Sequence, residues 1–165
     1  MAKFSRIIRE SNENLLITKF IEIFKGKLNK KKQSSKRLSF VLTGGKTPIR
    51  LYKKLANLKN LDWKKVDFFI GDERYVSKNS KNSNINLCRK YLLNKINVSH
   101  KQVFQINTNN NSIEKDTKEY EDKIKRYFLH RFKFECVEFE FTYLSSPIKK
   151  SIFLHCIFLV LLSSL

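Results

Sequence analysis

Two short apolar runs, each followed by a polar turn, limit most strongly how this chain can fold. "LSFVLT" (38–43) runs into Gly44-Gly45, and "VDFFIG" (66–71) runs into an acidic turn. Both runs have the length and composition of buried strands. Pro48, which suits the first turn of a helix, begins a helix-like stretch between them. Since strands that alternate with helices build a parallel sheet, this order predicts an α/β fold.

Further elements continue the alternation. Apolar residues recur at helical spacing in 12–31, in 84–96 and in a charged stretch at 113–132, and "VFQI" (103–106) is a short third strand. The sequence therefore predicts a Rossmann-like, largely parallel sheet that is flanked by helices.

The charge of the chain is strongly positive: 34 Lys and Arg against 15 Asp and Glu give +19. Such a balance is typical of proteins that bind nucleic acid or an anionic surface. The lysines are scattered, apart from "KGKLNKKKQSSKR" (25–37), and they accompany many Asn and Ile residues, which A/T-rich codons also specify. We interpret the charge as codon bias and expect no nucleic-acid partner. A non-enzymatic polyanion-binding protein with a basic patch at 25–37 remains the alternative.

The cysteines bear on the compartment. Cys88, Cys136 and Cys156 are far apart and form no CxxC pair. This pattern indicates neither a disulfide framework nor a zinc site, and it suits a reducing compartment. The N-terminus lacks the apolar core of a secretory signal. We therefore predict a cytoplasmic protein without a metal site, while its oligomeric state is left open.

Two polar loops follow the first two predicted strands, "TGGKTP" (43–48) and "GDERYV" (71–76). In open α/β sheets ligands bind at the carboxyl ends of the strands, where both loops would lie. The two loops therefore mark one candidate crevice.

The first loop has the features of a phosphate cradle. Gly44 and Gly45 would let the backbone approach a ligand, and the following helix would present free N–H groups to an anion. Lys46 would add a positive charge and Thr47 a hydroxyl donor. A tight connection between strand and helix would use the same glycines, and this is the structural alternative.

The second loop also allows two interpretations. In a structural turn, Asp72 would cap a neighbouring segment and Arg74 would pair with Glu73. In a functional loop, Asp72 would orient a water or a sugar hydroxyl, and Arg74 would bind a phosphate or carboxylate through two N–H groups. We favour the functional interpretation because both loops converge on one crevice.

Several short motifs occur together in one order. They are a GGxTP-like loop with LY in the helix behind it, DW before the second strand, GDER at its end, and SN before the next helix. In this order and spacing they resemble 6-phosphogluconolactonase over about residues 3 to 130. Glucosamine-6-phosphate deaminases share the TP loop and the DW but usually carry a different acidic motif, so they rank second.

The resemblance implies hydrolysis of 6-phospho-D-glucono-1,5-lactone to 6-phosphogluconate in the pentose phosphate pathway, without a metal or organic cofactor. The small-molecule partner would be a sugar phosphate, and no membrane partner is expected.

The resemblance also implies roles for particular residues. Asp72 and Arg74 would line the lactone and phosphate side of the crevice, and Asn84 would shape the loop beneath them. The residues implied to bind the substrate are Gly44, Gly45, Lys46, Thr47, Arg74 and Asn84. Lys46 stands where the family usually has Ser, which removes a hydroxyl donor but adds a cation that can serve a phosphate.

One expected element is absent from the sequence. The family's general base is a histidine in a "GxGxDGHxASLFP" segment, which takes a proton from the attacking water. None of His100, His130 and His155 lies in a DGH context. We therefore predict little or no lactonase activity for this chain.

The composition changes near residue 134, from Lys- and Asn-rich to Phe-, Leu- and Ser-rich. We predict a 6-phosphogluconolactonase-like domain at 1–133 and a divergent hydrophobic tail at 134–165. We interpret the tail as a changed reading frame, intron read-through or a truncated gene model. A membrane anchor at 151–165 is less favoured, because a spanning helix needs about 20 residues. The sheet would then be incomplete at its C-terminal end, with an uncovered edge.

Overall fold

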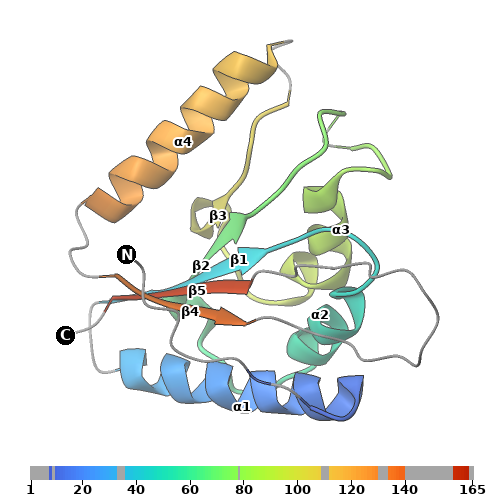
Figure 1. Cartoon of the computed structure of the whole chain (residues 1–165), viewed down its shortest axis with the longest axis vertical. Helices are drawn as coiled ribbons and strands as arrows, with labels where there is room; N and C mark the ends of the chain where they lie inside the picture. The colour runs from blue at the N-terminus through green and yellow to red at the C-terminus, as the bar shows by residue number, and fades with distance from the viewer. Residues whose placement is uncertain are drawn as a thin grey trace.

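The chain folds around one sheet that has helices on both of its faces (Figure 1). The structure, a computed structural model, describes residues 8, 10–32, 36–77, 79–108, 112–129, 134–139 and 158–163. Helix α1 (Glu13–Lys32) lies across one face, and α4 (Ile113–Leu129) lies on the opposite side. The predicted α/β fold is confirmed.

Three strands run parallel in the half of the sheet that we predicted. They are β1 (Leu38–Leu42), β2 (Val66–Ile70) and β3 (Val103–Phe104), and the sheet order is β3-β2-β1-β5-β4. In the register, Leu38 lies opposite Val66 and Phe68 lies opposite Val103. The carboxyl ends of β1, β2 and β3 therefore meet at one edge of the sheet.

The predicted tail contributes two strands to the same sheet. β4 (Phe134–Phe139) and β5 (Phe158–Ser163) pair antiparallel, and β5 also pairs antiparallel with β1, with Phe40 opposite Val160. We expected an uncovered sheet edge, and in the structure β5 occupies the edge of β1 away from β2. The apolar run 158–163 offers a backbone that can pair with any free edge.

Other expectations for the tail are only partly covered. Much of the candidate anchor at 151–165 lies outside the described residues, as do His130 and His155. Within the described ranges, no helix is both long and apolar enough to cross a membrane. The domain boundary between 133 and 134 remains a prediction.

The helices follow the predicted order with small shifts at their ends. α2 (Ile49–Ala56) begins directly after Pro48, and α3 (Asn84–Tyr91) is shorter than the predicted stretch 84–96. Leu92 leaves the helical conformation, at φ −135° and ψ −67°, and the next residues form the 3₁₀ turn η2 (Leu93–Lys95). Two more 3₁₀ turns, η1 (Trp63–Lys65) and η3 (His100–Gln102), precede β2 and β3.

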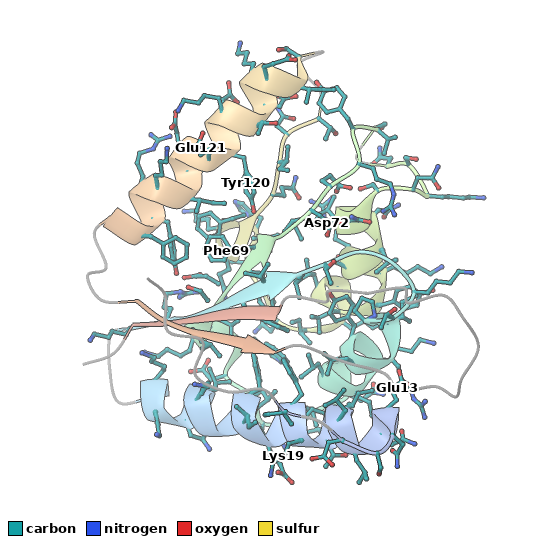
Figure 2. All side chains as sticks on the ribbon, viewed as in Figure 1. Glu13, Lys19, Phe69, Asp72, Tyr120 and Glu121 are labelled. Atoms are coloured by element: carbon teal, nitrogen blue, oxygen red, sulfur yellow. The ribbon has the colours of Figure 1, made fainter. Side chains whose placement is uncertain are left out.

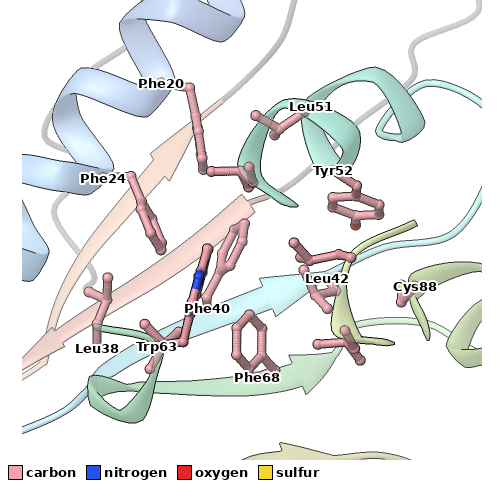
Figure 3. Close-up of a cluster of buried hydrophobic side chains, with 14 of the residues drawn as sticks. Phe20, Phe24, Leu38, Phe40, Leu42, Leu51, Tyr52, Trp63, Phe68 and Cys88 are labelled. Atoms are coloured by element: carbon pink, nitrogen blue, oxygen red, sulfur yellow. The ribbon is translucent and has the colours of Figure 1, made fainter. Parts of the chain in front are cut away.

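The face of the sheet towards α1 is apolar. Successive side chains of a strand point to opposite faces, and on this face β1 and β2 place six side chains that are at most 1% exposed. Rings from α1 pack on them, with the ring centroid of Phe40 5.7 Å from that of Phe20 and 5.3 Å from that of Phe24 (Figure 3). The six side chains are Leu38, Phe40, Leu42, Val66, Phe68 and Ile70.

The face towards α4 combines rings with polar groups. Phe69 stacks on Phe104 with a centroid distance of 4.5 Å, and Tyr127 of α4 meets both rings edge-on. The Tyr127 hydroxyl donates to Asp67 Oδ2 at 2.5 Å, and Arg37 Nε donates to the same oxygen at 2.8 Å. Polar side chains therefore fix the position of α4 on the sheet.

Candidate functional site

The first loop leaves β1 at Leu42 and enters α2 after Pro48. Tyr52 of α2 is fully buried, and its hydroxyl both accepts from Thr43 N at 2.9 Å and donates to Thr43 O at 2.8 Å. One side chain of α2 thus fixes both backbone groups of the first loop residue. The start of the loop is held at a set distance from the helix that follows it.

Both glycines of this loop are required by its geometry. Gly45 has φ +85°, a conformation that side-chain-bearing residues rarely adopt. A Cβ on Gly44 would lie 1.8 Å from Asn84 Oδ1. The close approach that we expected for a ligand is therefore made, at Gly44, by a side chain of the protein itself.

The N-terminus of α2 is open at the end of this loop. Pro48 occupies the N-cap position without a side-chain hydrogen bond, and Lys46 and Thr47 are exposed beside it. Arg50, in the first turn, donates to Glu13 Oε2 at 2.6 Å and to Asn14 Oδ1 at 2.8 Å. The first turn offers backbone N–H groups to an anion, and the exposed Lys46 lies in the loop just before it.

Asp72 joins the second loop to the first. Its Oδ1 accepts from Thr43 Oγ1 at 2.9 Å and from Gly44 N at 3.4 Å. Its Oδ2 accepts from Asn84 Nδ2 at 2.7 Å. Both carboxylate oxygens bind groups of the protein, so Asp72 fixes the two loops in one arrangement.

Glu73 has a role that the sequence analysis missed. Its Oε1 accepts from Asn84 N at 2.6 Å, and its Oε2 accepts from Ile85 N at 2.9 Å and from Ser83 Oγ at 3.1 Å. The carboxylate therefore caps α3, which has no acidic residue in its own first turn. That missing acid was the signal that could have indicated a carboxylate from elsewhere in the chain.

Arg74 lies directly after this cap. Its Nη1 donates to Asn84 Oδ1 and to Asn82 O, and its backbone N donates to Glu73 Oε1 at 2.8 Å. The pairing of Arg74 with Glu73 that we considered thus involves the backbone amide of Arg74. The residue itself is exposed, so its guanidinium lies at the rim of the site.

Asn84 is the centre of the arrangement. It is 1% exposed, and its side chain donates to Asp72 and accepts from Arg74. The structure therefore brings together Gly44, Asp72, Arg74 and Asn84, while Gly45, Lys46 and Thr47 continue the same loop towards α2. Figure 2 shows Asp72 just beyond the end of β2, on the side of the sheet edge where α3 begins.

The titratable groups near the site do not include a histidine within the described ranges. His100 lies in η3, whose Gln102 donates to Val66 O at 2.6 Å, at the start of β2. It therefore belongs to the amino edge of the sheet, opposite the site. Burial raises the pKa of the Cys88 thiol to about 12, so this thiol stays protonated near neutral pH.

No group of three or more His, Cys, Asp or Glu side chains in the described ranges could hold a metal ion. The site instead combines backbone amides, the Asn84 amide, and the cations Lys46 and Arg74 around two loops that the carboxylates of Asp72 and Glu73 hold in place. Such a set can bind an anion and fix the hydroxyl groups near it.

Comparison with known proteins places these motifs in a family. The family model for glucosamine-6-phosphate isomerases and 6-phosphogluconolactonases matches residues 11–144. A 6-phosphogluconolactonase from Thermotoga maritima is 32% identical over 105 residues, which are 64% of this chain and 47% of that protein.

Solved structures agree in fold. The 6-phosphogluconolactonase structure from Thermotoga maritima matches with a TM-score of 0.61 and 28% identity, over 74% of this chain and 53% of that chain. A monomeric glucosamine-6-phosphate deaminase matches with a TM-score of 0.63 and 19% identity, over 74% of this chain and 51% of that chain. The chain spans about half the length of these relatives.

Proposed function

The chain belongs to the family of glucosamine-6-phosphate isomerases and 6-phosphogluconolactonases, and on that premise we propose that its two-loop site binds a sugar 6-phosphate. The proposed ligand is 6-phospho-D-glucono-1,5-lactone, the sugar phosphate whose hydrolysis gives 6-phosphogluconate. The observation that carries the proposal is the position of Asn84, which links Asp72, Arg74 and the glycine loop beside the open end of α2.

The phosphate would bind at the first loop. The N–H groups of Gly45, Lys46 and Thr47 and the first turn of α2 would donate to its oxygens. The Lys46 ammonium would add a charge where the resemblance leads us to expect a Ser hydroxyl. Arg74 would reach the ligand from the other loop with charge-assisted hydrogen bonds.

The lactone end would face Asp72 and Asn84. Because both Asp72 oxygens already accept hydrogen bonds from the chain, Asp72 would act mainly by holding the loops. Hydrolysis needs a group that takes a proton from water near neutral pH. His100 lies at the other edge of the sheet, so for this chain we propose ligand binding with little or no turnover.

Calorimetric titration with 6-phosphogluconate, the reaction product, tests the proposal. We expect binding at micromolar concentrations, with gluconate, which lacks the phosphate, at least about tenfold weaker because it loses the charge-assisted bonds. Equal binding of the two compounds, or no binding of either, would contradict the proposal. Fresh lactone, corrected for its spontaneous hydrolysis, tests turnover in a parallel stopped-flow assay.

Titrations with two other ligands test the two alternative functions. Glucosamine 6-phosphate in place of 6-phosphogluconate tests the deaminase side of the family. Single-stranded RNA over a range of salt concentrations tests the polyanion alternative, since binding by scattered lysines would fall steeply with salt.

We also propose a cytoplasmic location, because the free, buried thiol of Cys88 suits a reducing compartment.

A further inference from the structure

The loop that carries Arg74 is held from two sides. Asp72 and Glu73, before Arg74, bind the glycine loop and the start of α3. Beyond it, the Tyr75 hydroxyl donates to Asp116 Oδ2 at 2.9 Å, and Val76 O accepts from Thr108 Oγ1 at 2.7 Å. Arg74 is therefore placed between one attachment to α3 and another to the α4 side of the molecule.

Asp116 is a firm anchor for the second attachment. It is 1% exposed and belongs to the first turn of α4, where its backbone N donates to Ser112 O at 3.0 Å. A buried carboxylate needs hydrogen-bond donors, and the Tyr75 hydroxyl is one of them. Tyr75 itself is 38% exposed, so its ring contributes little to the apolar core.

α4 is in turn fixed to the ends of the strands that form the site. The Tyr120 hydroxyl donates to Ile70 O at 2.8 Å and approaches Phe104 O at 3.2 Å, where β2 and β3 end (Figure 2). A rigid connection therefore runs from the carboxyl edge of the sheet through α4 and Asp116 to Tyr75, the residue next to Arg74.

We propose that Tyr75 and Asp116 form a clamp by which α4 sets the position of the Arg74 guanidinium for the phosphate of the ligand. Tyr75 is thus a positioning residue, and this inference rests on the proposed sugar-phosphate function. Charge-assisted bonds from Arg to phosphate depend on direction as well as distance. Releasing the Tyr75 end of the loop would leave the charge present but held only from the α3 side.

Tyr75→Phe tests the clamp, because it removes the hydroxyl and keeps the ring. We expect about a tenfold rise in the Kd for 6-phosphogluconate, the size expected when a charge-assisted contact is weakened. Tyr91→Phe is the matched control, since it makes the same change on α3 away from this loop. Asp116→Asn keeps an acceptor for the Tyr75 hydroxyl and should stay within about threefold of the unaltered protein.

A spectroscopic signal separates positioning from general stability. In ¹⁵N-labelled protein without ligand, Tyr75→Phe should shift the Arg74 Nε–Hε resonance and speed amide exchange at 72–77. The Nε–Hε resonance of Arg89 in α3 should stay unchanged. A merely structural bond would lower the melting temperature and leave the Arg74 resonance in place, and that result would overturn the clamp.

The two proposals can fail separately. If the unaltered protein binds 6-phosphogluconate and Tyr75→Phe binds it equally well, the clamp is wrong and the proposed function stands. If the unaltered protein does not bind it, the proposed function fails, and the clamp fails with it as a device for positioning a ligand.

Discussion

The two faces of the sheet are built by different kinds of contact. On the α1 face, buried rings such as Phe24, Phe40 and Trp63 pack together with aliphatic side chains (Figure 3). On the α4 side, tyrosine hydroxyls donate hydrogen bonds to specific acceptors: Tyr75 to Asp116, Tyr120 to Ile70 O and Tyr127 to Asp67. Apolar contacts are non-directional, whereas hydrogen bonds fix direction.

The two faces therefore contribute differently to stability and to the position of the site. The α1 face supplies most of the free energy of folding, because that free energy follows the apolar area removed from water. The α4 face contributes less but sets where the loops at the carboxyl edge lie. Substitutions on the two faces should therefore differ both in size and in what they change.

The largest effect is expected on the α1 face. Phe40→Ala removes a fully buried ring that contacts Phe20, Phe24 and Phe68. The lost burial and the cavity should lower the free energy of unfolding by about 3–5 kcal/mol. Urea unfolding followed by circular dichroism measures this. Phe40→Leu, which keeps most of the apolar volume, is the control. A loss below about 1 kcal/mol in Phe40→Ala would contradict the larger contribution of the α1 face to stability.

A smaller loss is expected where α4 meets the sheet. Tyr127→Phe removes the hydroxyl that donates to the buried Asp67 and keeps the ring that packs on Phe69. A hydrogen bond to a charged group contributes about 1.5–3 kcal/mol, so the free energy of unfolding should fall by that amount. If this loss equals that of Phe40→Ala in the same urea experiment, the two faces do not differ as we argue.

The stability of the protein at alkaline pH should reveal the burial of the Cys88 thiol in the core on the α1 side. Burial raises the pKa of the Cys88 thiol from 9.0 to about 12. The unfolded state therefore loses this proton first as the pH rises, and stability is full below pH 9 and falls above it. The slope for one group is at most about 1.4 kcal/mol per pH unit.

Cys88→Ala should flatten this slope between pH 9 and 10, measured by urea unfolding at each pH and referred to each protein's own value at pH 7. Tyr120→Phe serves as the control, because burial also raises the pKa of Tyr120 but from a starting value of 10.0. An unchanged slope in Cys88→Ala would contradict the deep burial of the thiol.

The smallest effect is expected at the end of β2. Tyr120→Phe removes the hydroxyl that donates to Ile70 O, so the free energy of unfolding should fall by about 1 kcal/mol, the net value of a neutral hydrogen bond. Hydrogen exchange should become faster around β3 and at 72–77 and stay unchanged in α1. Faster exchange throughout the chain would show that the hydroxyl supports the whole fold rather than the site edge.

The sequence predicted the parts that depend on local pattern. The runs 38–43 and 66–71 contain β1 and β2 because each is a short apolar run bounded by turn residues. Their following loops lie together because parallel strands end at one edge. The resemblance to the family is confirmed by the family model. The roles assigned to Lys46, Thr47 and Arg74 remain predictions.

What the sequence did not predict depends on contacts between distant residues. The cap that Glu73 forms on α3 and the bond between Tyr75 and Asp116, which are 41 positions apart, leave no periodic signal. The strand at 158–163 was missed because its unbroken apolar run resembles a membrane segment as much as a buried strand. In the structure that run pairs with β1 on one side and with β4 on the other, and neither contact is visible in a local pattern.

We propose that a sugar phosphate binds where the glycine loop meets Arg74. A titration of ¹⁵N-labelled protein with 6-phosphogluconate, followed residue by residue by NMR, tests this most directly. We predict that the amides of Gly45, Lys46 and Thr47 and the Arg74 side chain shift together with one saturation curve. Shifts confined to the lysine-rich end of α1, or no saturable shift at the loops, would contradict binding at this site.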